Sequence, residues 1–176
     1  ERSFPRTPSR EISTAVLTPT TRLAHGDELA KSPPPMTHRF PSDEWTQAFA
    51  AAVNDNETYR THGKPWTFGS VAMVLAADPS QGIEDDVGMI LDVHQGECRG
   101  AEYVKGMEAV QGAAFIIVAP YERWKKVIQG ELDPIKAMME GKLKMTKGHL
   151  PTMLRFVQSS RALVTSATAV PTEFIA

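Results

Sequence analysis

The sequence predicts an α+β domain in which helices cover one face of a five-stranded, mostly antiparallel sheet. Three observations lead to this fold class. An amphipathic helical pattern opens the domain at residues 41–56, and four strand-like segments follow between residues 66 and 120. Two short helical segments, a fifth strand and a last helix close the chain. No internal repeat interrupts this order of elements.

The opening helix is predicted from its cap and its apolar face. Ser42 is suited to cap residues 41–56, and Asp43 and Glu44 suit the positive N-terminal end of a helix. The apolar residues follow helical spacing along one face: Trp45, Ala48, Phe49, Ala52 and Val53. The polar run that follows, from residue 54 to 64, is expected to break or fray the helix.

The strands are predicted from apolar runs and alternation. A first strand over 66–79 ends at Asp78-Pro79, and residues 87–104 form a hairpin that turns near Gln95-Gly96. Its first arm alternates, with Met89, Leu91 and Val93 on one face and Ile90, Asp92 and His94 on the other. Because the run 113–120 is wholly apolar, that strand is expected to be central or covered on both faces.

The C-terminal third holds an unusual share of methionine. Helices are predicted at 121–131 and at 133–141, where Asp133 is the cap and Pro134 takes the first helical position. A strand over 142–148 and a helix over 150–167 follow. Four of the eight methionines lie between residues 130 and 156. Methionine is unbranched and polarizable, so these side chains fit either an ordinary core or a cavity that accepts varied apolar guests.

The first part of the chain differs from the rest. Six of the thirteen prolines lie within residues 1–35, among many Ser and Thr and without helical or strand period. Residues 1–38 are therefore predicted to be an extended tail, and residues 39–176 the folded domain. The chain starts at Glu1 rather than Met, which is expected of a processed chain or a fragment. The tail has two candidate binding surfaces: the surface of a partner protein and the surface of the folded domain itself.

Composition excludes several function classes. The net charge of −2 and the lack of a basic run give no reason to expect nucleic-acid binding. The longest apolar stretches are too short to cross a bilayer, and a single cysteine fits a reducing compartment. The compartment is expected to be intracellular, with a mitochondrial or a cytoplasmic location left open.

No reaction centre emerges from the sequence. The five histidines are dispersed, and no Gly-rich phosphate-binding motif occurs, so neither a metal nor a cofactor is predicted. Asp92 and His94 share a strand face and are read either as a surface pair or as a catalytic dyad. Cys98 is expected to be a half-buried strand thiol. A hydrolase or transferase acting on acyl-CoA would need a nucleophile, and none is found.

One long stretch resembles a known family. Residues 121–164, "YERWKKVIQGELDPIKAMMEGKLKMTKGHLPTMLRFVQSSRALV", resemble the C-terminal half of sterol carrier protein 2 (SCP-2) sterol-transfer domains. The ordered pattern G-x-L-D-P-x-x-A-M-x-x-G-K-L-K carries this resemblance. The stretch "SDEWTQAFAAAVNDNETYR" also looks like the opening helix of bacterial stand-alone members. The similarity spans roughly residues 40–174.

The resemblance implies a fold and a function. It implies five strands, helices over one face, and a hydrophobic tunnel between them that binds fatty acids, acyl-CoA, sterols or other lipids without covalent chemistry. The candidate lipid-binding residues, with one face chosen for each strand, are Phe49, Met73, Leu75, Met89, Leu91, Phe115, Ile117, Trp124, Ile128, Met138, Met139, Met145, Met153 and Val157. A lysine set near the last strand (Lys142, Lys144, Lys147) is read either as attracting an anionic lipid head or as a solvated strand face.

A second function class stays open. Some members of this family are accessory domains of larger enzymes, and some serve quinone synthesis. The chain is therefore also a candidate subunit of a larger, possibly mitochondrial, assembly that residues 1–35 would hold in place.

Overall fold

The computed structural model describes residues 36–176. Residues 1–35 lie outside the described residues; they hold most of the predicted tail (1–38) and the whole of the predicted arm. Strand β1 begins at His38, within the range predicted as tail, and runs to Phe40.

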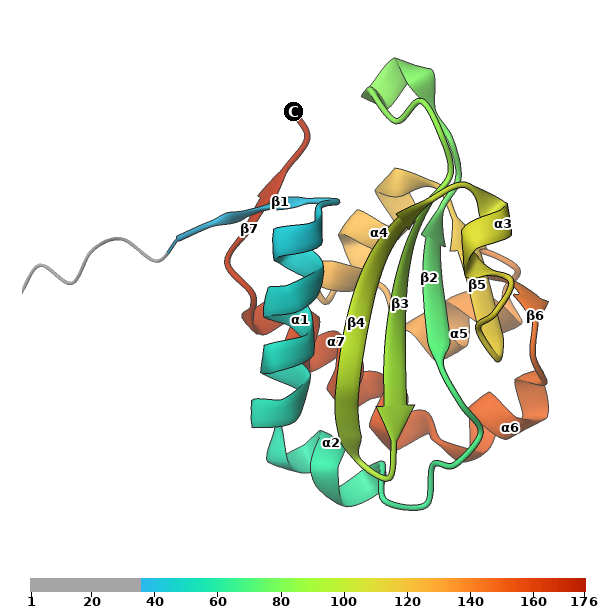
Figure 1. Ribbon diagram of the computed structural model, residues 1–176. Helices are drawn as coiled ribbons and strands as arrows, with labels where there is room; N and C mark the ends of the chain where they lie inside the picture. Colours follow the sequence, from blue (N-terminus) through green and yellow to red (C-terminus); the bar gives the residue numbers. More distant parts are fainter. Residues whose placement is uncertain (1–35) are drawn as a thin grey trace, which may run out of the picture. The chain divides into compact units, whose positions relative to one another are not determined.

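Five strands form the main sheet in the order β4-β3-β2-β5-β6 (Figure 1). Neighbouring strands are antiparallel except for the central pair β2 and β5, which is parallel, so the sheet is mixed. The parallel pair arises because the chain leaves β4 and crosses back through the short helix α3 before it enters β5. The bounds are Val71–Leu75 for β2, Val87–His94 for β3, Glu97–Lys105 for β4, Phe115–Ala119 for β5 and Lys144–Lys147 for β6.

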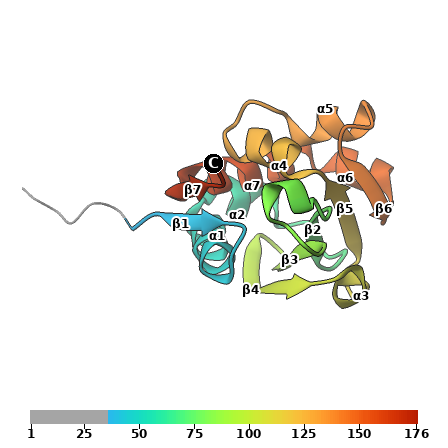
Figure 2. The ribbon, with the colours of Figure 1, turned by 90° about the horizontal axis from the view of Figure 1, so that it is seen from above.

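Most helices lie on one side of this sheet, as predicted. Figure 2 shows α1, α4 and α7 on one side and α3 on the other. A turn of 3-10 helix at Pro79–Gln81 follows β2. The helix bounds are Asp43–Asp55 for α1, Glu57–His62 for α2, Met107–Val110 for α3, Tyr121–Ile128 for α4, Pro134–Met139 for α5, Leu150–Arg155 for α6 and Val157–Ala169 for α7.

The two faces of the sheet belong to two separate cores. Leu91 and Ile117 join the larger core beneath the helices, whereas Ala72 and Ile116 join a small core with Val110 of α3. The strand faces chosen from alternation are therefore confirmed. The wholly apolar strand β5 is covered on both faces, as its sequence predicts.

The first helix ends where a second begins. The Ser42 hydroxyl accepts the N–H of Trp45 at 3.0 Å, which confirms the predicted cap. Asn56 follows the last residue of α1, and its side-chain oxygen accepts the N–H of Tyr59 at 3.2 Å. The polar run after residue 53 thus breaks the helix at Asn56, as expected, and then forms the short helix α2.

The predicted single helix over 150–167 is wrong. The chain departs from helical geometry at Phe156, where φ is −110° and ψ is 34°, and this residue separates α6 from α7. The Phe156 ring lies 5.0 Å from the Trp66 ring, and this contact anchors the break. Met153, before the break, is buried, whereas Val157 and Val164, after it, are half-buried.

A small second sheet, not predicted, joins the two ends of the described chain. Strand β1 pairs in parallel with β7, Thr172–Phe174 (Figure 1). The Trp45 indole donates to the Thr172 hydroxyl at 2.9 Å. Beyond β7, the N–H of Ile175 donates to the Tyr121 hydroxyl at 2.7 Å. The C-terminal segment is thereby fixed to α1 and α4.

The hairpin between β3 and β4 turns at Gln95-Gly96, as predicted. Gly96 has a φ of 84°, and a Cβ at this position would overlap the Arg60 carbonyl at the end of α2. Gly82 also has a positive φ, 75°, but a Cβ there would meet no atom within 4 Å.

We expect Gly96→Ala to destabilise the protein more than Gly82→Ala does. Both substitutions bear the left-handed penalty of about 1–2 kcal/mol, and only the first adds a clash with backbone, which costs about 1–3 kcal/mol more. Urea unfolding followed by circular dichroism measures both. Equal losses would show that α2 moves away from the hairpin without cost.

Candidate functional site

An apolar pocket lies between the sheet and helices α4, α5 and α7. It encloses about 60 Å³. Its polar lining comes from Ser160 of α7, and apolar side chains dominate the rest. The lining residues are Phe49, Val71, Met73, Leu91, Ile117, Trp124, Val127, Ile128, Pro134, Met138, Leu143, Met153, Ser160, Leu163, Val164 and Ala167.

Eight of the residues predicted from the sequence line this pocket. They come from helix α1, from three neighbouring strands, from α4 and α5, and from α6. These residues are Phe49, Met73, Leu91, Ile117, Trp124, Ile128, Met138 and Met153. Sequence segments that are far apart thus contribute to one apolar space.

Four predicted residues share the same core without reaching the pocket. Leu75 and Met89 are fully buried, one near the end of β2 and the other opposite Met73. Phe115 contacts the Trp66 ring instead, at 5.1 Å, and Met145 packs half-buried against the core from β6. Alternation selects a sheet face, but it does not select which positions along a strand border the space.

Two other predicted residues lie away from the pocket. Met139 is 67% exposed, because Met138 faces inward and adjacent residues of a helix point about 100° apart. Val157 follows the break at Phe156 directly; it packs half-buried against the same core but is not among the lining residues. Met139 and Val157 are corrections to the predicted placement.

Several lining residues were not predicted from the sequence. Val71 shares the strand face of Met73, and Val127 and Leu143 belong to apolar faces that the pattern already shows. In α7, Ser160, Val164 and Ala167 keep helical spacing from Met153, but Ser160 and Ala167 are polar or small and gave no strong apolar signal. Pro134 was predicted only as the first residue of a helix, and not as a lining residue.

Trp124 fixes one wall of the pocket. Its side chain is 2% exposed, and its indole N–H donates to the carbonyl of Val74 at 2.8 Å. This bond joins α4 to β2 across the core. Among residues 36–176, no fully buried side-chain nitrogen or oxygen lacks a hydrogen-bond partner.

Two further hollows adjoin the pocket. One, which we call the α7 groove, encloses about 280 Å³ and is lined by Gly130, Leu132, Asp133, Pro134, Arg161, Val164, Thr165 and Thr168. It shares Pro134 and Val164 with the pocket.

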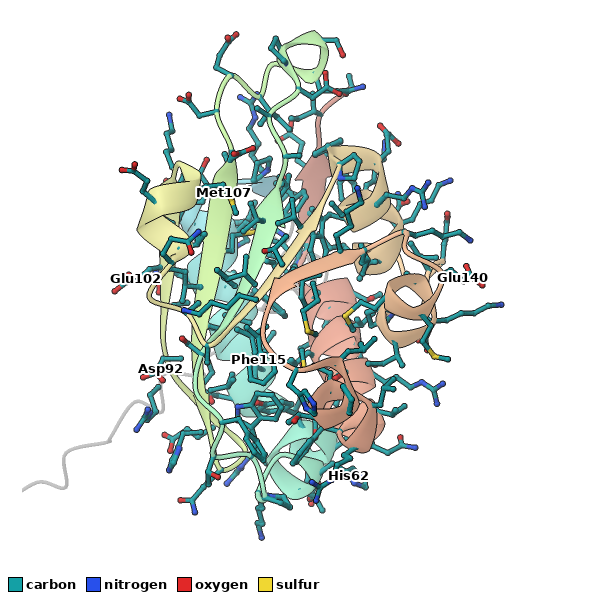
Figure 3. All side chains as sticks on the ribbon, turned by 90° about the vertical axis from the view of Figure 1, so that its right-hand side faces the viewer. His62, Asp92, Glu102, Met107, Phe115 and Glu140 are labelled. Atoms are coloured by element: carbon teal, nitrogen blue, oxygen red, sulfur yellow. The ribbon has the colours of Figure 1, made fainter. Side chains whose placement is uncertain are left out.

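The other hollow, which we call the aromatic end, encloses about 20 Å³ and is partly lined by Trp66 and Phe156. It shares Met153 and Leu163 with the pocket. Figure 3 labels Phe115 in this region, between the sheet and the last helices. The three hollows therefore adjoin one another along α7.

The remaining candidate groups are surface features. Asp92 accepts a hydrogen bond from the Arg99 guanidinium at 2.9 Å, so its carboxylate forms a surface ion pair across the hairpin. Lys142 pairs with Glu140 at 2.6 Å, and the Lys147 ammonium donates to the Gln111 carbonyl at 2.6 Å. None of these groups lines the pocket.

Cys98 is buried rather than half-buried. Its side chain is 5% exposed and its thiol donates to the Gly100 carbonyl at 3.3 Å. Burial raises the pKa of the thiol. Thiolate is the nucleophile, so the native protein presents little reactive sulfur.

We expect iodoacetamide to label Cys98 slowly in the native protein and rapidly in urea, because both burial and the raised pKa disfavour the thiolate. Mass spectrometry of timed samples measures the labelled fraction. Native labelling as fast as that of a free thiol would contradict the buried placement.

Within residues 36–176, no group of three or more His, Cys, Asp or Glu side chains is placed to hold a metal ion. Across the same range, no helix is long and apolar enough to span a membrane.

The protein has a mixed five-stranded sheet, and helices on one side of this sheet enclose an apolar pocket. It therefore falls in the class of small α+β domains with an internal apolar pocket. The family model of the SCP-2 sterol transfer family matches residues 69–158. The chain belongs to this family.

Solved structures agree with this assignment. A crystal structure of sterol carrier protein 2 is 34% identical, with a TM-score of 0.69, and the alignment covers 73% of this chain and 97% of that one. A conserved hypothetical protein of Thermus thermophilus, suggested to be a sterol carrier protein, is 32% identical with a TM-score of 0.70. That alignment covers 81% of this chain and 96% of the other. Among curated proteins, no match is found.

Proposed function

We propose that this protein binds the hydrocarbon part of a lipid in the apolar pocket and carries it without covalent chemistry. The observation that carries the proposal is an apolar space on the fold of a sterol transfer family, joined to a groove at the surface. Each methylene group moved from water into such a space contributes about 0.8 kcal/mol. A long acyl chain therefore binds with few polar contacts, even after ordering costs.

The pocket must enlarge to hold a whole lipid. Its volume of about 60 Å³ is small beside the roughly 300–1,000 Å³ of typical ligand sites. Helix α5 has only six residues, and α7 is separated from α6 by the break at Phe156. Met138 and Met153 line the wall that these helices form, and methionine adapts its shape more easily than branched residues do.

The proposal is tested by native mass spectrometry of the purified full chain, followed by solvent extraction and identification of what co-purifies. A stoichiometric lipid supports the carrier function and names its class. The delipidated protein is then titrated with a fluorescent fatty acid. A protein that carries no lipid and takes up none contradicts the proposal.

The alternative, an accessory subunit held by residues 1–35, stays a prediction because that segment lies outside the described residues. It is tested by deleting residues 1–35. A carrier keeps its lipid affinity without them, whereas a subunit loses its place in an assembly. A mitochondrial or cytoplasmic location likewise stays open to a localisation experiment.

A further inference from the structure

The ion pair between Arg161 and Asp133 lies in the α7 groove. The Arg161 Nε donates to Asp133 Oδ2 at 2.9 Å. The other carboxylate oxygen accepts the N–H groups of Ile135 and Lys136, both at 3.0 Å, as the cap of α5. Partial burial acts to raise the pKa of Asp133, but these backbone bonds and the guanidinium outweigh it, so the pKa lies below its usual value. Asp133 is thus a fixed, charged anchor for one edge of Arg161.

The rest of the guanidinium is available. Only Nε of Arg161 makes a hydrogen bond within the described residues, and the side chain is 55% exposed. Its two NH₂ groups form the outer edge of a planar fork. This edge matches the two oxygens of a carboxylate or phosphate, which arginine binds in pairs.

The position of Arg161 relates this edge to the pocket. Val164 follows Arg161 by three residues on α7 and therefore lies on a neighbouring helical face. Val164 and Pro134 border both the α7 groove and the pocket. An anionic group on Arg161 would leave an attached hydrocarbon chain next to this shared boundary.

Other cations do not offer this arrangement. Lys142 and Lys147 are already engaged by Glu140 and by the Gln111 carbonyl. Among the described residues, Arg161 is the only Arg or Lys that lines the pocket, the α7 groove or the aromatic end.

We propose that Arg161 binds the anionic head of an acyl lipid whose chain enters the pocket between Pro134 and Val164. This inference rests on the proposed function and adds a ligand class to it, because it favours anionic acyl lipids over neutral ones. The shared chemistry is a pair of anionic oxygens, from a carboxylate or from a phosphate.

The test compares three ligands that carry the same chain: oleate, oleoyl lysophosphatidate and neutral oleyl alcohol. Affinities are measured on the delipidated full chain by displacement of a fluorescent fatty acid. In Arg161→Gln we expect oleate to lose roughly tenfold or more in affinity, as a lost charge-assisted pair requires, and oleyl alcohol to change little. The matched control is Arg155→Gln, which removes an exposed arginine outside the groove. It should leave the affinities of all three ligands unchanged.

A second variant separates head-group binding from a structural role of the ion pair. Asp133→Asn removes the competing charge and keeps an oxygen for the α5 cap, so it should keep or raise oleate affinity. If the pair only holds α7 in place, Asp133→Asn and Arg161→Gln will weaken all three ligands equally, and the inference is overturned.

The remaining outcomes are also decisive. If only lysophosphatidate depends on Arg161, the head is a phosphate rather than a carboxylate. If the wild type binds all three ligands and Arg161→Gln changes none, the carrier function stands and the inference fails. If the wild type binds none, the proposed function itself fails.

Discussion

Met153→Trp is expected to abolish most uptake of a long-chain fatty acid. Met153 is 5% exposed and borders both the pocket and the aromatic end, so a larger side chain there fills the space between them. Excluding four methylene groups costs about 3 kcal/mol, which corresponds to roughly a hundredfold loss of affinity. Titration of the delipidated variant with a fluorescent fatty acid measures this loss.

The chain offers a matched control four residues away. Val157 is half-buried and lies outside the pocket lining, so Val157→Trp makes a comparable change of size without filling the pocket. Overpacking costs about 1–3 kcal/mol, which most domains tolerate. If folded Met153→Trp binds as tightly as the wild type, the lipid lies elsewhere.

Trp124→Ala is expected to destabilise the protein by about 3–5 kcal/mol. The substitution removes a large buried side chain from the pocket wall and leaves the Val74 carbonyl without the indole donor. Urea unfolding followed by far-ultraviolet circular dichroism measures the change, since this signal does not depend on tryptophan emission.

Trp124→Phe divides this effect into two parts. Phenylalanine keeps most of the apolar volume but cannot donate a hydrogen bond, so we expect a loss of about 1–3 kcal/mol. A Trp124→Ala loss below about 1 kcal/mol would mean that α4 is not fixed to β2 through this residue. The expected result would instead show that the Trp124 side chain stabilises the packing of α4 on β2.

The parts of the fold that follow from local pattern could be predicted from the sequence. Alternation placed Met89 and Leu91 on the buried face because the strand period is two, and the Asp133-Pro134 pair marked the start of α5. The unbroken apolar run of β5 predicted its burial on both faces.

The errors arise where distant residues decide the local structure. Phe156 is neither Gly nor Pro, so its residue type gives no local signal of the break between α6 and α7; its ring packs against Trp66, which is distant in the sequence. Leu163 and Ala167 of α7 line the pocket, although the sequence pattern did not select them. Met139 was misplaced because a pattern of adjacent methionines does not show which one faces inward.

The pairing of β1 with β7 bears on the order in which this protein folds. His38 and Thr172 are partners although nearly the whole described chain separates them, and each strand has only three residues. Closing so long a loop costs conformational entropy that a few backbone bonds barely offset. We therefore expect the two-stranded sheet of β1 and β7 to form after the main sheet and to open first. Its backbone amides should then exchange with solvent well before those of β2 and β3.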